Sequence, residues 1–203
     1  ARVPPGMASA DGGSWVDELE TIVALSDATA GYVIEGLRPK AVALPSDLQE
    51  LRRVIAMAAG SDSAVAPWGG GTQTALGNRI QRLDLVVDLS RLTEVQHNPG
   101  DLTATVQAGV TISELQRALG EHGQFLALDP PLPDRATIGG TLAAGLSGPL
   151  KWQYGSPRDT VIGMTIVQAD GRVTKSGGRV VKNVSGYDMA RLHVGGLGTL
   201  GVI

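Results

Sequence analysis

The order of its predicted elements favours an α+β fold for this sequence, and its length and composition add that one domain with an aliphatic core is expected. Helical and strand patterns alternate without the strict strand–helix–strand order of a doubly wound sheet. The chain has 203 residues, enough to bury the core of one domain. Apolar residues make up 42% of the chain and aromatic residues only 3%, whereas glycine occupies 28 positions, about twice its usual share. We therefore expect an aliphatic core, with glycine where the main chain closely approaches another group.

Helices are predicted from apolar spacing and from capping residues. Residues 15–25 carry apolar side chains at helical spacing. Ser46–Gln49 and Thr111–Glu114 each have the form of a capping box and precede amphipathic stretches that end near Gly60 and Gly120. A short helix is also predicted at 187–194.

Strands are predicted where short apolar runs lie between turn residues. The turn dipeptide Asp170-Gly171 predicts a hairpin between 161–169 and 172–174. In 102–108, the alternation of residue types predicts that Leu102, Ala104 and Val106 share one face. The other predicted strands are 32–34, 41–44, 64–67 and 83–89.

Charge and composition exclude several classes of function. Lys and Arg number 17 and Asp and Glu 20, a net charge of −3, so the chain lacks the basic excess of a nucleic-acid-binding protein. Cysteine is absent, which excludes disulfides and thiolate chemistry. His97, His122 and His193 lack the spacing of metal ligands, so no metal site is expected. No apolar run reaches the length of a membrane span, and we expect a cytoplasmic protein without direct membrane insertion.

The glycine loop, Pro67–Gly77, is the first segment that predicts chemistry. It follows an apolar strand and contains three consecutive glycines, whose amides can point into one concavity. A diphosphate could lie against this bare main chain, with the Thr72 hydroxyl beside it. The alternative is a flexible surface loop. The stiff entry at Pro67 and Trp68 and the Gly-Thr-Gln-Thr composition favour the phosphate site.

A second glycine-rich segment, 136–148, follows a proline-rich loop at 129–134. Thr137 is a candidate N-cap for a helix of small residues, and a helix N-terminus presents amides to an anion. Gly139 and Gly140 would leave room for a ligand. Close helix packing explains such residues equally well, so this segment alone leaves both interpretations open.

A third segment matches the pattern GxGxxG at Gly196, Gly198 and Gly201. The match precedes a predicted strand rather than a helix, and no acidic residue follows about 20 positions later, so we do not interpret it as a Rossmann motif. The chain also lacks GxxxxGK[ST], the signature of P-loop phosphoryl transfer.

Taken together, five segments resemble the FAD-binding domain of the vanillyl-alcohol oxidase/p-cresol methylhydroxylase (PCMH) superfamily. They are PWGGGTQTALG, ATIGGTLAAGLSGP, YGSPRDTVIGMTIVQADGRV, VVKNVSGYDMARL and GTLGVI, in that order. The resemblance covers 36–203 and leaves 1–35 as an N-terminal tail and helix. It implies a two-subdomain α+β PCMH-type domain with FAD between the subdomains, truncated before a C-terminal cap domain.

The resemblance also implies which residues bind FAD. The glycine loop would carry the pyrophosphate, and the second segment would follow the pyrophosphate and the ribityl chain. Tyr154, Gly155, Gly201 and Val202 would lie near the flavin or the adenine. The full set of expected FAD-binding residues is Pro67, Trp68, Gly69, Gly70, Gly71, Thr72, Gln73, Gly77, Pro131, Ala136, Thr137, Ile138, Gly139, Gly140, Ala143, Gly148, Tyr154, Gly155, Gly201 and Val202.

The departures from the family pattern suggest a subgroup. Members with covalent flavin often carry histidine in or near the glycine loop, where this chain has Thr72, so we expect dissociable FAD. Ala-Gly-Leu-Ser-Gly-Pro from Ala144 is similar to the FAD-binding E subunits of bacterial glycolate oxidases. Lys182 is a candidate cation beside the flavin, although a solvated lysine explains it as well. No catalytic residue can be assigned.

The implied function is hydride transfer from the α-carbon of glycolate, or another 2-hydroxy acid, to FAD. Electrons would then pass to the other subunits of a glycolate oxidase complex, a catalytic flavoprotein and an iron–sulfur subunit, through which the chain could associate with a membrane. Two alternatives stay open. One is a non-catalytic scaffold subunit with vestigial FAD binding, and the other is an oxidoreductase for D-lactate or a sugar lactone.

Overall fold

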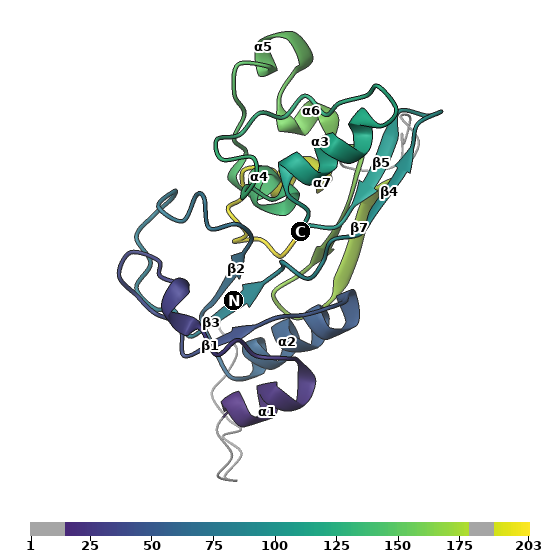
Figure 1. The fold of residues 1–203 in the computed structure, drawn as a ribbon. Coiled ribbons are helices and arrows are strands. Elements are labelled where there is room, and N and C mark those ends of the chain that lie inside the picture. Colours follow the sequence, from purple (N-terminus) through teal and green to yellow (C-terminus); the bar gives the residue numbers. More distant parts are fainter. Residues whose placement is uncertain (1–14, 179–188) are drawn as a thin grey trace.

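The computed structural model describes residues 15–178 and 189–203 and confirms the α+β fold class. The elements fall into two groups (Figure 1). The first surrounds two hydrophobic clusters built mainly from the first half of the chain, and the second surrounds one cluster built from the second half, the second core. No helix within the described ranges is both long and apolar enough to cross a bilayer.

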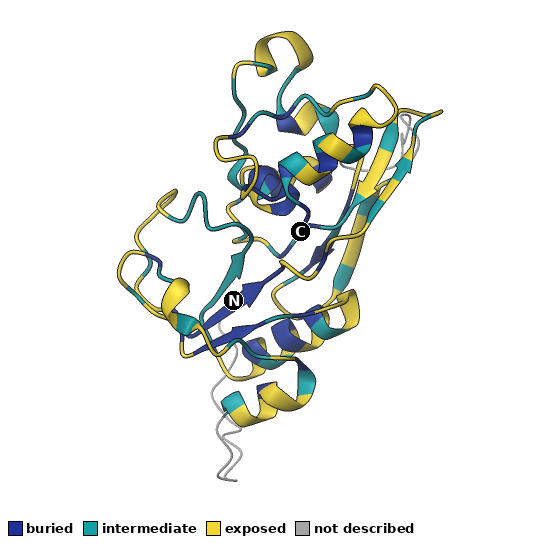
Figure 2. Cartoon of the chain, in the orientation of Figure 1, coloured by how far each residue is buried: buried dark blue, intermediate teal, exposed yellow. Residues whose placement is uncertain are grey.

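The first group is a parallel sheet covered by two helices. Strands β1 (Ala41–Ala43), β3 (Leu85–Asp88) and β2 (Val65–Trp68) are hydrogen-bonded in that order, with all pairs parallel. Helices α1 (Trp15–Ile22) and α2 (Leu48–Gly60) pack beside each other below this sheet (Figure 1). Strands β1 and β3 are buried along their whole length, as expected of apolar strands in a parallel sheet, whereas the edge strand β2 is half-buried (Figure 2).

Residues 15–35 are part of this first group. Leu19 of α1 is fully buried in the same core cluster as Val54 of α2 and Leu85 of β3. A short 3₁₀ helix, η1 (Thr29–Gly31), follows α1. The division of the chain at residue 35 stays a prediction.

The second group combines helices with two antiparallel hairpins. Strands β4 (Val95–Asn98) and β5 (Thr103–Val106) form one hairpin, and β6 (Gly163–Val167) and β7 (Val173–Gly177) form the other. Helices α3 (Ile112–Gly120), α4 (Ile138–Ala144) and α7 (Met189–His193) contribute to the second core, and the short helices α5 (Lys151–Tyr154) and α6 (Pro157–Thr160) lie above it (Figure 1).

The capping predictions hold at α3 and shift by one residue at α2. Thr111 and Glu114 form the expected reciprocal capping box. At α2 the N-cap is Asp47, whose carboxylate accepts the amides of Gln49 and Glu50 at 2.7 and 2.8 Å. Ser46 instead donates its amide and its hydroxyl to Glu50, so the cap lies one residue later than the pattern predicted.

The hairpin around Asp170-Gly171 is confirmed, with Gly171 at φ +80°. In the alternation predicted for 102–108, the placement of Leu102 is wrong, whereas Ala104 and Val106 both lie in β5, two residues apart. Leu102 lies in a turn at φ +55° and is 75% exposed, and the strand begins at Thr103 with β4 as its only partner among the described residues. A two-stranded ribbon with both faces partly exposed imposes no strict alternation.

Other differences concern short elements. The predicted strand at 32–34 contributes only an isolated bridge between Ile34 and Leu37. Strand β4 and helices α5 and α6 were not predicted. The part of the predicted helix 187–194 that precedes Met189 lies outside the described residues, as does Lys182.

Candidate functional site

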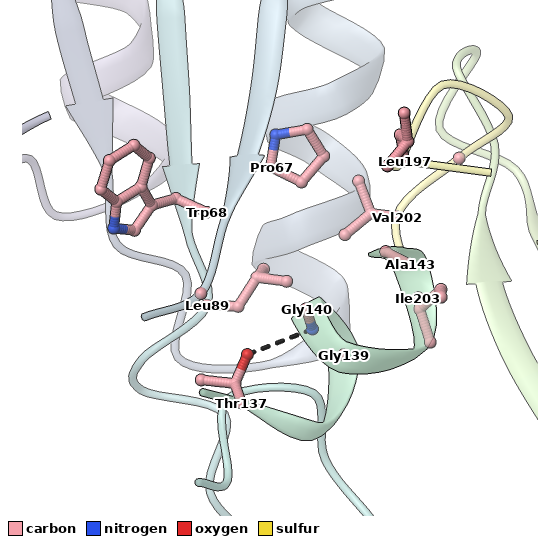
Figure 3. Close-up of a pocket in the computed structure, with 13 residues that line it drawn as sticks. Pro67, Trp68, Leu89, Thr137, Gly139, Gly140, Ala143, Leu197, Val202 and Ile203 are labelled. Atoms are coloured by element: carbon pink, nitrogen blue, oxygen red, sulfur yellow. Dashed lines mark hydrogen bonds between the residues drawn. The ribbon is translucent and has the colours of Figure 1, made fainter. Parts of the chain in front are cut away.

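A cleft lies between the end of β2, helix α4 and the C-terminal segment (Figure 3). Three segments that are far apart in the sequence, near residues 68, 140 and 200, form its walls, and Leu89 after β3 lies between the first two. The lining residues are Pro67, Trp68, Gly69, Leu89, Thr137, Gly139, Gly140, Ala143, Leu197, Gly198, Gly201, Val202 and Ile203.

The first wall is the beginning of the glycine loop. Main-chain amides of residues 69–73 donate no hydrogen bond within the part of the chain that the structure describes, although these residues are all half-buried. Half-buried amides without a protein acceptor need water or a ligand as partner. Gly71 adopts φ +64° and lies against the ring of Trp68, which folds the loop back on itself. The loop therefore presents a run of unsatisfied donors next to the cleft.

Close packing against the second glycine-rich segment requires two of the glycines in this loop. A Cβ added at Gly69 would overlap the Thr137 hydroxyl, and one at Gly70 would overlap the carbonyl oxygen of Arg135. The Arg135 guanidinium also donates a hydrogen bond of 3.1 Å to the Gly70 carbonyl. The two glycine-rich segments thus contact each other directly.

The second wall is α4, whose first amides are already satisfied. Ile138 donates to Val110 O at 2.8 Å and Gly139 to Ala108 O at 2.9 Å. Gly140 donates to the Thr137 hydroxyl at 3.2 Å, as Figure 3 shows. Thr137 is therefore the N-cap that the sequence predicted. The expectation that this helix presents free amides to an anion is wrong, because neighbouring main chain and the cap accept them.

Small residues on α4 serve two different purposes. Gly139 packs on the neighbouring main chain, since an added Cβ would lie 2.7 Å from Ala108 Cβ. Gly140 is exposed to the cleft, and its added Cβ would meet only the Thr137 hydroxyl, at 3.0 Å. Ala143, one turn later, also lines the cleft. At the cleft, helix α4 therefore leaves open space, and its first three amides are not free to donate.

The third wall is the segment before the C-terminus. Gly195 and Leu197 donate their amides to Leu142 O and Ala143 O at 2.9 and 2.8 Å, which fixes the segment to the end of α4. Val202 then pairs with Val167 of β6 in an isolated bridge. The GxGxxG match is thus followed by strand-like pairing and not by a helix, in agreement with the decision not to interpret it as a Rossmann motif.

The cleft brings together nine of the residues expected to bind FAD. They are Pro67, Trp68, Gly69, Thr137, Gly139, Gly140, Ala143, Gly201 and Val202. A second group belongs to the same segments but does not line the cleft: Gly70, Gly71, Thr72, Gln73, Ala136 and Ile138, of which Ala136 and Ile138 are part of the second core.

The other expected residues lie elsewhere. Pro131 is exposed in the proline-rich loop. A Cβ added at Gly77 would lie 2.8 Å from a methyl carbon of Leu197. Gly148 donates its amide to Asp129 at 2.8 Å, and Tyr154 packs edge-to-face on Phe125 with ring centroids 5.4 Å apart. Gly155 caps α5 at φ +89°. None of these residues lines the cleft, although Gly77 lies against Leu197, which does, and their roles stay predictions.

Four lining residues were not in the expected set: Leu89, Leu197, Gly198 and Ile203. Gly198 packs on Pro67, with an added Cβ 3.2 Å from the proline ring. The glycine pattern at 196–201 was the available signal for Leu197 and Gly198. Nothing in the local sequence distinguishes Leu89 from other strand-end leucines, because its place depends on the sheet order.

Behind the first wall, a half-buried polar contact supports Trp68. The Tyr32 hydroxyl donates to the Asp88 carboxylate at 2.6 Å, and the Tyr32 ring packs edge-on to Trp68 with centroids 5.2 Å apart. Burial, and then the hydrogen bond to the negative Asp88, raises the pKa of Tyr32 to about 12. Among the described residues, no group of three acidic or histidine side chains could hold a metal ion.

Comparison with known proteins gives a consistent family. The family described as FAD binding domain matches residues 39–177. Glycolate oxidase subunit GlcD of Bacillus subtilis is 34% identical over 81% of this chain, and D-lactate dehydrogenase of Archaeoglobus fulgidus is 33% identical over 94%. Glycolate oxidase subunit GlcE of Escherichia coli is 38% identical over 66%. The chain spans 35%, 45% and 39%, respectively, of the length of these relatives.

A solved structure shows the same fold over nearly the whole chain. An alkyldihydroxyacetonephosphate synthase superposes with a TM-score of 0.78 at 24% identity, covering 99% of this chain and 43% of that one.

Proposed function

This chain belongs to the FAD binding domain family, and we propose that it is the FAD-binding part of an oxidoreductase for 2-hydroxy acids of the glycolate type. Similarity to glycolate oxidase subunits and to D-lactate dehydrogenase supports this class of substrate. The observation that carries the proposal is the run of main-chain amides at 69–73 that have no acceptor among the described residues, beside a cleft that α4 lines with small residues.

In this proposal the glycine loop binds the diphosphate of FAD. Its free amides donate to the phosphate oxygens, and Gly140 and Ala143 leave room for the chain that joins the diphosphate to the flavin. None of the described lining residues is a histidine, cysteine or tyrosine that could bond covalently to a flavin. This composition supports dissociable binding.

FAD, when bound, supplies the hydride acceptor for the substrate α-carbon. The described lining residues include no titratable side chain, so they can position the cofactor and exclude water but cannot take the proton of the substrate hydroxyl. We therefore expect the proton acceptor and the substrate-binding residues to lie outside this set. A cap domain or a partner subunit of a glycolate oxidase complex, a second flavoprotein or an iron–sulfur subunit, would supply them and accept the electrons. Such partners are also the route by which a cytoplasmic protein would associate with a membrane.

Absorbance spectroscopy and FAD titration of the purified chain test the proposal. We expect flavin bands after FAD is added and unbound FAD is removed, and release of unmodified FAD when the protein is denatured. Gly140→Leu fills the cleft beside Thr137 and should abolish binding, or weaken it at least about tenfold, through steric exclusion.

The matched control is Gly120→Leu, which also replaces an exposed helical glycine. Gly120 ends α3, does not line the cleft, and has open space where a Cβ would be added. This variant should bind FAD like the unmodified chain. Absence of flavin bands in the unmodified chain would overturn the proposal, as would equal FAD affinity of the two leucine variants.

A non-catalytic scaffold subunit is the second candidate, because the described cleft holds no proton acceptor. Dye reduction by the FAD-loaded chain, with glycolate, D-lactate or a sugar lactone as substrate, distinguishes the candidates. Turnover by the chain alone excludes the scaffold, and the preferred substrate identifies the specificity. If the chain alone binds FAD but shows no turnover, and if adding the partner subunits restores turnover, the result supports the leading proposal.

A further inference from the structure

We propose that Arg135 is a positioning residue for the glycine loop: by holding the Gly70 carbonyl, it directs the Gly71 amide toward a bound diphosphate. The inference rests on the proposed function, because it assumes that the loop binds the diphosphate of FAD. It also assigns a role to an exposed side chain that the sequence motifs did not include.

Main-chain contacts fix the base of the Arg135 side chain. The Arg135 and Ala136 amides both donate to Leu132 O, at 2.9 and 2.8 Å, and close a tight turn in which Leu132 has φ +57°. The first turn of α3 holds this segment from the other side, because Ser113 donates its hydroxyl to Asp134 at 2.6 Å. The side chain therefore starts from an ordered position.

From this base Arg135 contacts Gly70 in two ways. Its carbonyl oxygen lies where a Gly70 side chain would be, and its guanidinium donates to Gly70 O at 3.1 Å. Carbonyl and amide groups of one trans peptide point in opposite directions, and no cis peptide is present among the described residues. The Gly71 amide therefore points away from the guanidinium.

Arg135 contacts the glycine loop without being part of the cleft. Arg135 does not line the cleft, whereas Gly69 and Thr137 do. The guanidinium is thus not part of the cleft lining, and the Gly71 amide, which faces the opposite side, has no acceptor among the described residues. The hydrogen bond fixes the orientation of a donor that would otherwise rotate with a flexible glycine peptide, and a donor oriented in advance loses less entropy when it binds an anion.

The charge of Arg135 acts in the same direction. None of the ion pairs among the described residues includes Arg135, so its positive charge is not neutralised by a carboxylate. A cation beside amides that bind a diphosphate adds to the attraction and makes the binding dependent on salt.

Arg135→Met and Arg135→Lys separate this role from general stability. Methionine keeps an unbranched aliphatic side chain without donor or charge, whereas lysine keeps one donor and the charge. We expect Arg135→Met to weaken both FAD and ADP about tenfold or more, and Arg135→Lys to restore most of the affinity. In the ligand-free protein, the ¹H–¹⁵N NOE of the Gly70 and Gly71 amides should fall in Arg135→Met and recover in Arg135→Lys.

The control is Arg53→Met, which removes an exposed guanidinium that donates to Gln49 O on α2, a helix that contributes no residue to the cleft. It should change neither readout. If Arg135→Met binds FAD like the unmodified chain, or leaves both loop NOE values unchanged, the positioning role is overturned while the proposed function stands. If the unmodified chain binds no FAD, the proposed function fails, and the NOE values alone then decide whether Arg135 orders the loop.

Discussion

The glycine loop and helix α4 have similar compositions and face the same cleft, but their main-chain amides are in opposite states. Amides 69–73 have no acceptor among the described residues, whereas the amides of Ile138, Gly139 and Gly140 are all accepted by protein oxygens. The loop can therefore bind an anion through its main chain, and α4 cannot do so without breaking existing hydrogen bonds.

This difference shows that glycine content alone does not identify an anion site. Glycines in both segments permit close packing: Gly70 on Arg135 and Gly139 on Ala108. The segments differ in their hydrogen bonds. The loop amides have no acceptor among the described residues and are free to donate to a ligand, whereas the first amides of α4 already donate to protein oxygens.

Gly70→Ala should have the largest effect, because it alters the packing of the loop and the orientation of its amides together. The added Cβ overlaps a main-chain oxygen of Arg135, which cannot move as a flexible side chain could. We expect a loss of about 1–3 kcal/mol in the free energy of unfolding and loss of detectable FAD binding. Chemical denaturation and FAD titration measure the two effects, with Gly60→Ala, which has open space around it, as control. If Gly70→Ala leaves FAD affinity unchanged, the proposal that the glycine loop rather than α4 binds the diphosphate is contradicted.

Thr137→Ala tests the other side of the comparison. Loss of the N-cap hydroxyl frees the Gly140 amide and should cost about 1 kcal/mol of stability, which Thr137→Ser should restore. FAD affinity should fall far less than in Gly70→Ala, because the α4 amides are not proposed as ligands. A large loss of affinity with unchanged stability would assign the diphosphate to α4 instead.

Tyr32→Phe sharpens the comparison at the support of the first wall. The variant keeps the ring against Trp68 and removes the hydrogen bond to Asp88, at a cost of about 1 kcal/mol in stability. Because the pKa of Tyr32 is raised from 10.0 to about 12, its stabilising contribution is present below pH 10 and lost as the pH rises toward 12. Thermal unfolding of Tyr32→Phe should lack this alkaline component. The control is Tyr154→Phe, which replaces an exposed tyrosine and should keep the alkaline loss of stability. If this variant also lacks that loss, Tyr32 is not its source.

His193 gives the smallest expected effect, at the helix that precedes the third wall. Burial holds the pKa of His193 below its ordinary value of 6.5. The unfolded chain therefore takes up a proton at a higher pH than the folded chain, and stability is lost as the pH falls below about 6.5. Replacement by glutamine should reduce this acid sensitivity, by no more than about 2 °C in Tm at pH 5.5. The control is His122→Gln, at an exposed position, which should not reduce the acid sensitivity. If both variants lose the same stability below pH 6.5, His193 is excluded as the source of that loss.

Features encoded within a few residues could be predicted from the sequence. The capping residues Thr111 and Thr137 and the turn at Asp170-Gly171 are local signals, and the structure confirms all three. Strand β4 and the turn at Leu102 were missed because they depend on pairing between polar strands, which carries no periodic apolar pattern.

The site could be predicted only in part for the same reason. Composition located the loop and α4, but the acceptors of the α4 amides, Ala108 and Val110, come from another part of the chain. Likewise, the contact between Arg135 and Gly70 joins residues 65 positions apart. No local pattern reports which of two glycine-rich segments retains free donors.

The most direct test is NMR titration of the ¹⁵N-labelled chain with FAD and with ADP. The account predicts that the amide protons of residues 69–73 shift downfield as they donate to phosphate oxygens, while the amides of Ile138, Gly139 and Gly140 keep their present acceptors and shift little. Large downfield shifts in those three α4 amides, with the loop unchanged, would contradict it.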